Sequence, residues 1–376
     1  MGTTNRIHID ANRYLWAIQR AGLTLEDYIK SHPKVSLPDW IDGTKEPTIK
    51  QLEAFAKTVH VPFGFLFLEH LPEENVPFPV FRGKAGKYDH FDLNVYDTVS
   101  AIQQRQDWLE DYLVDNEIDT CKLVHSVNLK TPIGETVNKL RNVLQLEPQW
   151  AFSFKTPEAA VKKLTEMLEY AGVFVAYNGV VGNNPHRPLT ISECRGFALV
   201  NPIAPYIFIN SRDASTAQLF TLIHEVTHLM LGISAGHIAT DESFTNDIHE
   251  NYCDQVAAEF LVPFEELKKI WNGKIKYIAR KFCVSELVVA RRAHDTGLLS
   301  SRDYQSFWKE YSNRPTHQKD KKSGGDFYRT SAKRVGRLFA IHVRNAVNNR
   351  QLSYTDAYRL TGLYGNTYTK FMNDNI

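Results

Sequence analysis

The sequence has few cysteines and no long apolar run, and each absence excludes a class of protein. Four cysteines are scattered through 376 residues, at Cys121, Cys194, Cys253 and Cys283, and none forms a C-x-x-C pair. This pattern argues against a disulfide framework or a cysteine zinc cluster and fits a reducing compartment. The apolar stretch "VPFGFLFL" is far shorter than the roughly 20 residues of a membrane helix, so we expect no membrane association.

The sequence also has almost no net charge and no segment typical of a secretory leader. The formal net charge is +1, which gives no general attraction to nucleic acid or to a membrane surface. The opening "MGTTNRIHIDANRY" has no apolar segment of the kind found in signal peptides. With 43% hydrophobic and 23% charged residues, the composition is that of an ordinary folded protein. We therefore expect a cytoplasmic protein.

The chain is too long for one compact core, so we expect several domains. Amphipathic segments alternate with two polar or proline-rich stretches, "LPEENVPFPVFRGKAG" and "YSNRPTHQKDKKSGGD", which are typical of linkers. Six segments are predicted: a helix-turn-helix bundle (1–72), a linker (73–90), a helical connecting region (91–155), the domain that carries the chemistry and has a helix-turn-helix-like end (156–300), a polar linker (301–326) and a basic helical tail (327–376).

Three short apolar runs in the 156–300 segment predict strands: "VFVAY", "RGFALVNP" and "PYIFINSR". Most of the remaining pattern is helical. The fold class predicted is therefore α+β, a mostly helical multidomain chain with a small sheet. The last of the three runs could be an ordinary sheet member or an edge strand on which an extended peptide pairs.

The stretch "TLIHEVTHLMLG" contains the strongest chemical motif. His224 and His228 are four residues apart, so on a helix both imidazoles project from one face and can bind one zinc ion. In an H-E-x-x-H helix, Glu225 faces the attacking water and acts as the catalytic base. The alternative is a buried core helix in which the two histidines are incidental.

A catalytic zinc needs a third protein ligand, and "HENYCDQVAAEF" offers one. We expect Glu250 to be that ligand, with Asp254 one helical turn later accepting the outer N–H of His224. His249 and His237 are rival ligands, but neither has such a partner. Cys253 is expected to be a small buried residue.

Together, "RGFALVNPIAPYIFINSRD", "FTLIHEVTHLMLG" and "ENYCDQVAAEFLVP" resemble the ImmA/IrrE family of zinc metallopeptidases. Residues 23–69 are similar to the degenerate XRE-type helix-turn-helix of long family members, and residues 324–371 to their C-terminal helical tail. The resemblance implies a gluzincin-like metallopeptidase core, in which a sheet with antiparallel strands packs on the zinc-binding helices. It assigns His224, His228 and Glu250 as zinc ligands and Glu225 as the base. The implied substrate is a DNA-binding repressor whose cleavage switches on stress, mobile-element or toxin–antitoxin genes.

Other surfaces remain candidates for partners. The N-terminal bundle is neutral and has Pro38 in or at the start of its expected recognition helix, so protein docking is favoured over operator binding. Residues 327–376 carry eight basic side chains and two acids, a net charge of about +6, which could contact DNA or a toxin. The alternative function is a non-proteolytic regulator or antitoxin that binds through its helical ends and has a structural zinc site.

Overall fold

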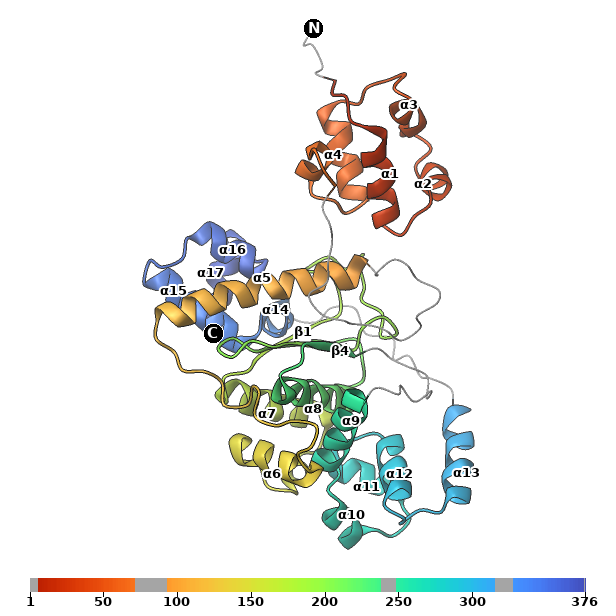
Figure 1. Ribbon diagram of the computed structural model, residues 1–376, viewed down its shortest axis with the longest axis vertical. Helices are drawn as coiled ribbons and strands as arrows, with labels where there is room; N and C mark the ends of the chain where they lie inside the picture. The colour runs from red at the N-terminus through yellow and green to blue at the C-terminus, as the bar shows by residue number, and fades with distance from the viewer. Residues whose placement is uncertain (1–5, 72–92, 238–247, 315–326, 375) are drawn as a thin grey trace. The chain divides into compact units, whose positions relative to one another are not determined.

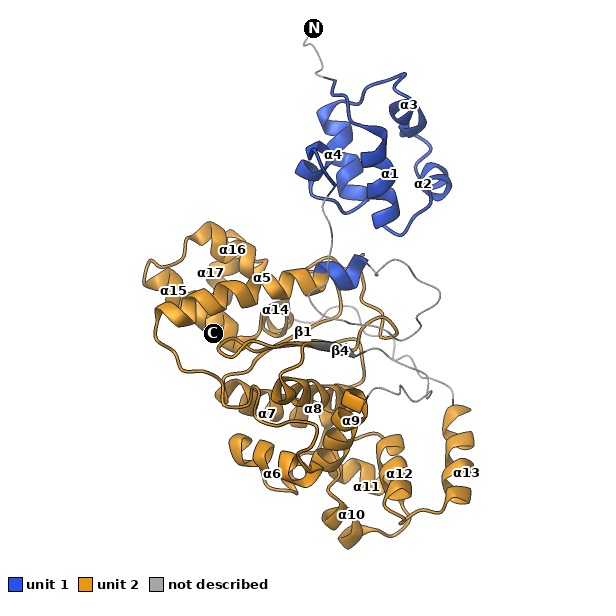
Figure 2. Cartoon of the chain, viewed as in Figure 1, with its two compact units in different colours: residues 1–77, 84–97 blue, residues 78–83, 98–376 orange. Residues whose placement is uncertain are grey.

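The chain forms two compact units, each with its own hydrophobic core. A computed structural model describes residues 6–71, 93–237, 248–314, 327–374 and 376. The first unit comprises residues 1–77 and 84–97, and the second comprises residues 78–83 and 98–376 (Figure 2). The buried residues of the two units form separate hydrophobic clusters.

The first unit is a small helical bundle. Its elements are α1 (Ala11–Arg20), α2 (Leu25–Ser31), α3 (Leu37–Ile41), α4 (Ile49–Thr58) and a 3₁₀ turn η1 (Phe63–Phe67). Thr24 caps α2, and Thr48 forms a reciprocal capping box with Gln51 at the start of α4. The aromatic residues Trp40 and Phe55 are both buried in its core. Helix α3 has only five residues and contains Pro38 in its first turn.

The second unit contains the sheet and the remaining helices. The helices are α5 (Leu93–Asp115, which begins in the first unit), α6 (Ile133–Leu144), η2 (Trp150–Ser153), α7 (Pro157–Tyr170), α8 (Ser215–Leu231), α9 (Ile248–Leu261), α10 (Phe264–Ile270), α11 (Ile275–Phe282), α12 (Glu286–Asp295), α13 (Ser301–Ser312), α14 (Phe327–Val335), α15 (Arg337–Asn348), α16 (Tyr354–Thr361) and α17 (Gly365–Asp374). The strands are β1 (Phe174–Asn178), β2 (Gly196–Leu199), β3 (Tyr206–Asn210) and β4 (Ala235–His237). The three predicted strands are all present, and β4 was not predicted.

The four strands form one mixed sheet in the order β1-β3-β2-β4. Strands β1 and β3 pair in parallel, with Phe174 opposite Tyr206, whereas β2 pairs antiparallel with both β3 and β4. The interpretation of "PYIFINSR" as an edge strand is wrong, because β3 lies between β1 and β2. Its run of apolar residues is explained by burial on both faces.

Helices cover both faces of the sheet (Figure 1). Val175, Tyr177 and Ile207 belong to the core that includes α7 and α8. The alternating residues face the other way: Phe174 has its ring 5.7 Å from that of His342 on α15, and Tyr206 lies 6.3 Å from Phe339. The strict alternation of a β-strand thus divides the sheet residues between two helical layers.

Segments from both ends of the unit build the second layer. Gln106 of α5 donates hydrogen bonds to the carbonyl oxygens of Leu199 and Ala204, at 2.9 and 2.8 Å. Tyr206 donates its hydroxyl hydrogen to the carbonyl of Val335, at the end of α14. The predicted segments 91–155, 156–300 and 327–376 therefore all contribute to one compact unit.

The central helix α8 is fixed at its C-terminal end by a distant segment. The helix ends at Gly232 in the left-handed conformation, with φ of 74°. Two of its last carbonyls accept backbone hydrogen bonds from the 121–127 segment, His125 N to Leu229 O and Val127 N to Met230 O. A Cβ atom on Gly232 would lie 1.9 Å from the ring of His125, so only glycine fits there.

These observations confirm the predicted α+β class, mostly helical with a small mixed sheet. Within the described ranges, no helix has both the length and the apolar character needed to cross a membrane.

Candidate metal centre

The two histidines of the H-E-x-x-H motif lie side by side on the buried helix α8. His224 and His228 are 0% and 1% exposed, and their Nε2 atoms are 3.0 Å apart. The rings are tilted by 62°, with centroids 4.8 Å apart. Leu222, Val226 and Leu229 bury the rest of the helix in the core. Since burying polar rings is costly without partners, this pair needs neighbours that satisfy its nitrogens.

Helix α9 supplies those neighbours, and α6 holds α9 in place. Tyr252 of α9 is hydrogen-bonded to the hydroxyl of Thr136 at 2.6 Å and to the carbonyl of Thr131 at 2.8 Å. At the other end of α9, the buried guanidinium of Arg141 donates to the carbonyl of Phe260 at 3.1 Å. A cation at the C-terminus of a helix is favoured by the helix dipole. Both contacts fix α9 against α6 and thereby the residues that face α8.

Glu250 of α9 completes a triangle of donor atoms with the two imidazoles. Its carboxylate oxygens lie 3.1 Å from His224 Nε2 and 3.3 Å from His228 Nε2. In a tetrahedral zinc site with bonds of about 2.0–2.1 Å, neighbouring ligand atoms are roughly 3.3–3.4 Å apart. Two imidazole nitrogens and one carboxylate at this spacing fit a zinc ion, and they leave a fourth position open.

Asp254 orients the first histidine. Its Oδ1 lies 3.0 Å from His224 Nδ1, so it accepts the proton of that nitrogen and leaves Nε2 directed to the triangle. Burial by itself would lower the pKa of His224, but the hydrogen bonds to Asp254 and Glu250 outweigh it and raise that pKa to about 10. In the metal-free protein this ring therefore holds a proton where a metal ion would bind.

The carboxylate of Glu225 is buried without a hydrogen-bond partner among the described residues. The side chain is 0% exposed and neither oxygen is satisfied. Burial raises the pKa of Glu225 to about 8; the nearby His224 opposes this rise and the charge of Glu250 adds to it. Unpaired buried carboxylates are rare because desolvation is costly, and those with a pKa near neutrality are suited to proton transfer.

Cys253 is a donor that the sequence interpretation left out. It is fully buried, and its sulfur lies within 4.8 Å of donor atoms of both His224 and His228, so these three residues could also hold a metal. Glu250, Cys253 and Asp254 stand at i, i+3 and i+4 on α9, so Cys253 and Asp254 each lie about one turn from Glu250, and all three have donor atoms near the histidines of α8. This spacing could have identified Cys253 as a possible metal ligand from the sequence. The absence of a C-x-x-C pair led instead to the expectation of a small buried residue.

The rival histidine ligands find no support in the described contacts. His249 precedes Glu250 on α9, and successive helical side chains project about 100° apart, so the two face different directions. His237 is the last residue of β4, where it is paired with Gly196 of β2. Its side chain lies outside the described part of the structure.

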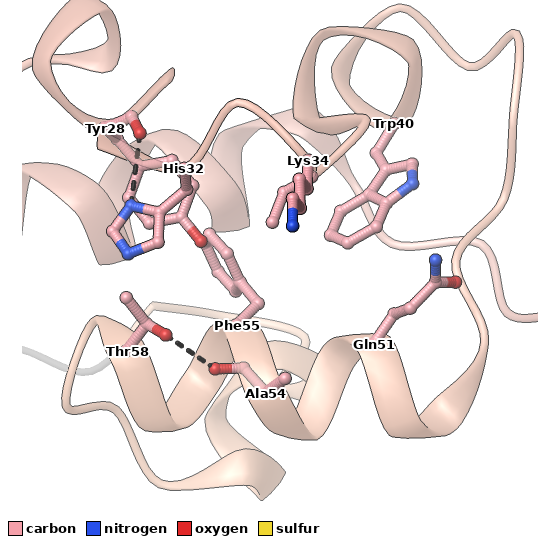
Figure 3. Close-up of a pocket in the computed structure, with 9 residues that line it drawn as sticks. Tyr28, His32, Lys34, Trp40, Gln51, Ala54, Phe55 and Thr58 are labelled. Carbon is pink, nitrogen blue, oxygen red and sulfur yellow. Dashed lines mark hydrogen bonds between the residues drawn. The ribbon is translucent and has the colours of Figure 1, made fainter. Parts of the chain in front are cut away.

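A pocket of about 140 Å³ lies in the first unit, between α2, α3 and α4 (Figure 3). Its aromatic walls include Tyr28, Trp40 and Phe55, and Lys34 is also part of its lining. The ring of His32 stacks on Tyr28 with centroids 4.6 Å apart. None of its lining residues is a carboxylate or a cysteine, so the pocket lacks the acidic and thiol metal ligands that are found beside the histidines of α8. Its lining is suited to binding an apolar or aromatic group.

The triangle, the buried glutamate and the orienting aspartate form a candidate metal site. A peptidase family model described as the IrrE N-terminal-like domain matches residues 169–294, the segment from the end of α7 to α12. This match supports the ImmA/IrrE family that the motifs resemble. A second model, described only as a domain of unknown function, matches residues 335–374. Neither match covers residues 1–72, where the XRE-like helix-turn-helix stays a prediction. A search of curated proteins gave no match.

Proposed function

We propose that this protein is a zinc-dependent endopeptidase that cleaves a protein partner in the cytoplasm. The observation that carries the proposal is the buried, unsatisfied carboxylate of Glu225 beside three converging donor atoms. A structural metal site does not require an unpaired buried carboxylate, whereas metal-assisted peptide hydrolysis requires a general base beside the metal.

The residues have separable roles. His224, His228 and Glu250 hold the zinc ion, which supplies Lewis-acid chemistry and allows water to act as a nucleophile near neutral pH. Glu225 accepts a proton from the attacking water and delivers it to the leaving nitrogen of the scissile bond. Asp254 keeps His224 in the tautomer that presents Nε2 to the metal.

The sheet supports a way for substrate to bind. Strand β4 directly follows α8, and among the described strands only β2 pairs with it, so its other edge offers backbone groups. An extended peptide added there would be an additional strand beside the metal-binding helix.

The substrate class that we propose is an XRE-type transcriptional repressor, whose removal switches on stress, mobile-element or toxin–antitoxin genes. The first unit supports a docking role. Its aromatic pocket is a recess of the kind that accommodates side chains of a protein partner.

Substitution Glu225→Gln tests the proposal. The amide cannot accept the proton from water, so cleavage should fall by about 10²–10⁴-fold while bound zinc, measured by atomic emission, stays at one equivalent. Cells that express either form can be compared by labelling new protein N-termini. We expect new termini in a DNA-binding repressor only with the unsubstituted chain. Equal cleavage by both forms contradicts the proposal.

The position of the Cys253 sulfur near both histidines favours a second candidate function, that of a non-proteolytic regulator or antitoxin. If its thiolate were a fourth ligand beside Glu250, the site would be closed and structural, and the protein would act as a regulator or antitoxin by binding alone. In that case Glu225→Gln would form the same partner complex as the parent chain and switch on the same genes.

A further inference from the structure

The last two helices form a helix-turn-helix in the second unit, independent of the metal centre. Helix α16 starts at the cap Ser353, which accepts the N–H of Asp356 at 3.1 Å, and ends at Gly362 with φ of 69°. The turn to α17 is short because Gly362 takes up the left-handed conformation and Thr361 accepts the N–H of Leu363. Two short helices joined by a turn of about three residues that contains glycine are typical of this motif.

One face of the motif is packed and the other is open. The packed residues come from both helices and the turn; they are Ala357, Thr361, Leu363, Tyr368, Phe371 and Met372. The exposed face of α17 carries Asn366, Thr369, Lys370 and Asn373, which follow the helical spacing i, i+3, i+4 and i+7, and the helix ends with the exposed Asp374 one turn after Lys370. Such a stripe lies along one side of a helix about 15 Å long.

The chemistry of this stripe matches the edges of base pairs. Asparagine pairs in bidentate fashion with adenine, lysine with guanine, and threonine with either purine or with a thymine methyl group. A face that bound an acidic protein would need only positive charge. Two asparagines two turns apart on one helix face can also recognise the hydrogen-bond donors and acceptors of base edges. The five-residue α3 of the first unit has no comparable stripe, and its Asp39 is paired with Lys45.

The segment that contains the stripe is basic. Residues 327–376 carry eight basic side chains and two acids, and six of the basic ones are exposed: Arg329, Lys333, Arg337, Arg350, Arg359 and Lys370. The ammonium of Lys370 lies 5.0 Å from the ring of Tyr328, which brings α14 next to α17. Of the two acids, Asp356 is already close to Arg359, at 3.6 Å. Backbone phosphates would be neutralised by these cations.

We propose that residues 354–374 bind duplex DNA, with α17 in the major groove. The exposed asparagines and Thr369 contact base edges, while Lys370 and exposed arginines of residues 327–376 contact phosphates. This activity goes beyond peptide hydrolysis and needs neither the metal nor Glu225.

The first experiment measures affinity of the full-length chain for a labelled mixed-sequence duplex by fluorescence anisotropy. Reversing one phosphate-contacting charge, Lys370→Glu, should weaken binding by roughly tenfold at 0.1 M salt and reduce the slope of log K against log salt by about one. The matched control is Lys276→Glu, the same charge change at an exposed position of α11, which should leave the affinity unchanged. Melting temperatures check that both variants fold.

The second experiment selects sequences from a random duplex pool. The parent chain should enrich a motif, and the double variant Asn366→Ala with Asn373→Ala should lose roughly 5- to 100-fold of the preference for it, while retaining binding to mixed sequence. Glu225→Gln should enrich the same motif as the parent chain, so this result and the peptidase result can fail separately.

Three outcomes would overturn the proposal. The first is the absence of duplex binding at 50 mM salt. The second is weaker binding by Lys276→Glu with unchanged binding by Lys370→Glu. The third is displacement of the duplex by poly-glutamate as effectively as by unlabelled DNA, with no motif enriched, which would assign the face to an acidic protein partner.

Discussion

At the residue scale, the chain concentrates its buried polar groups on two turns of α8. His224, Glu225 and His228 are all at most 1% exposed in a helix whose other buried residues are apolar except for Thr221 and Thr227. Each buried imidazole is compensated by a carboxylate of α9, whereas Glu225 is not compensated. Stability alone would not retain such a carboxylate, since a buried unsatisfied group costs roughly 1–3 kcal/mol.

The identity of the third ligand can be decided at this scale. If Glu250 is the ligand, Glu250→Gln should lower zinc affinity by more than the roughly 10- to 100-fold expected for loss of the orienting partner in Asp254→Ala. Cys253→Ser should then keep one equivalent of zinc. Competition with a fluorescent chelator measures all three variants.

The reverse pattern would reject this ligand assignment. Loss of zinc in Cys253→Ser together with retention in Glu250→Gln would make the site a His–His–Cys centre. Circular dichroism of each metal-free variant is the control for folding.

At the element scale, the junction between α14 and α15 shows how close packing restricts a residue type. Gly336 has φ of 86°, and a Cβ atom built on it would lie 2.6 Å from the carbonyl oxygen of Val175 in β1. Helix α15 therefore begins with no capping side chain of its own. Glu169 of α7 replaces it, because its Oε1 accepts the N–H of Leu338 at 3.1 Å.

Substitution Gly336→Ala should lower the free energy of unfolding by about 2–4 kcal/mol, because it adds a steric clash with β1 to the strain of a positive φ. Gly273→Ala is a matched control. Its φ is 75° but nothing lies within 4 Å of the added atom, so it should cost only about 1 kcal/mol. Urea unfolding of both variants measures the difference, and equal losses would show that the contact with Val175 is relaxed.

Glu169 makes stability depend on pH. Burial raises the pKa of Glu169, against the hydrogen bond from Leu338 and the charge of Arg337, so the folded state binds a proton more tightly than the unfolded state. The stabilisation is complete below the ordinary carboxyl pKa of about 4.3 and is lost as pH rises through the raised value. In Glu169→Gln the amide accepts the same N–H and does not ionise. We therefore expect this variant to lose less stability than the parent chain between pH 4.5 and 8.

Urea unfolding across that pH range measures the effect. Glu265→Gln at an exposed position of α10 is the control for a removed charge, and it should reproduce the parent profile. A Glu169→Gln profile that falls as steeply as that of the parent chain would contradict the argument.

Local rules of sequence were sufficient for much of the structure at these two scales. Thr24 and Ser285 accept a backbone N–H from the first turn of the following helix, as their residue types favour at a cap, and Pro157 opens α7, which suits its fixed φ. The spacing of His224 and His228 predicted one helical face. The spacing of Glu250 and Asp254 on a second helix predicted a ligand and its partner, but only the fold shows the approach of α9 to α8, which brings these residues to His224 across 26 and 30 residues of sequence.

Pairings between distant segments could not be predicted in this way. The three-residue β4 is too short for a periodic signal, and the insertion of β3 between β1 and β2 depends on contacts across the whole sheet. The same limit explains why the 327–376 segment was predicted as a tail. Its apolar residues show helical spacing but not the partner that they cover.

At the scale of the whole molecule, the sheet is complete only when α14 and α15 cover its second face. Phe174 and Tyr206 are 2% and 0% exposed, and they contact His342, Phe339 and the carbonyl of Val335. Exposing two such aromatic side chains costs roughly 2–3 kcal/mol each, which is a large part of the stability of an ordinary domain.

A chain that ends at residue 326 should therefore lose the native state of the second unit, although its metal-binding residues are all present. We expect it to bind a hydrophobic dye, to lose near-ultraviolet circular dichroism and to retain less zinc. A chain that lacks residues 1–71 is the matched control, because the first unit has a separate core, and it should keep the fold and the metal. If the chain ending at 326 instead melted cooperatively at the parent temperature, the last helices would be an appendage rather than the second layer of the sheet.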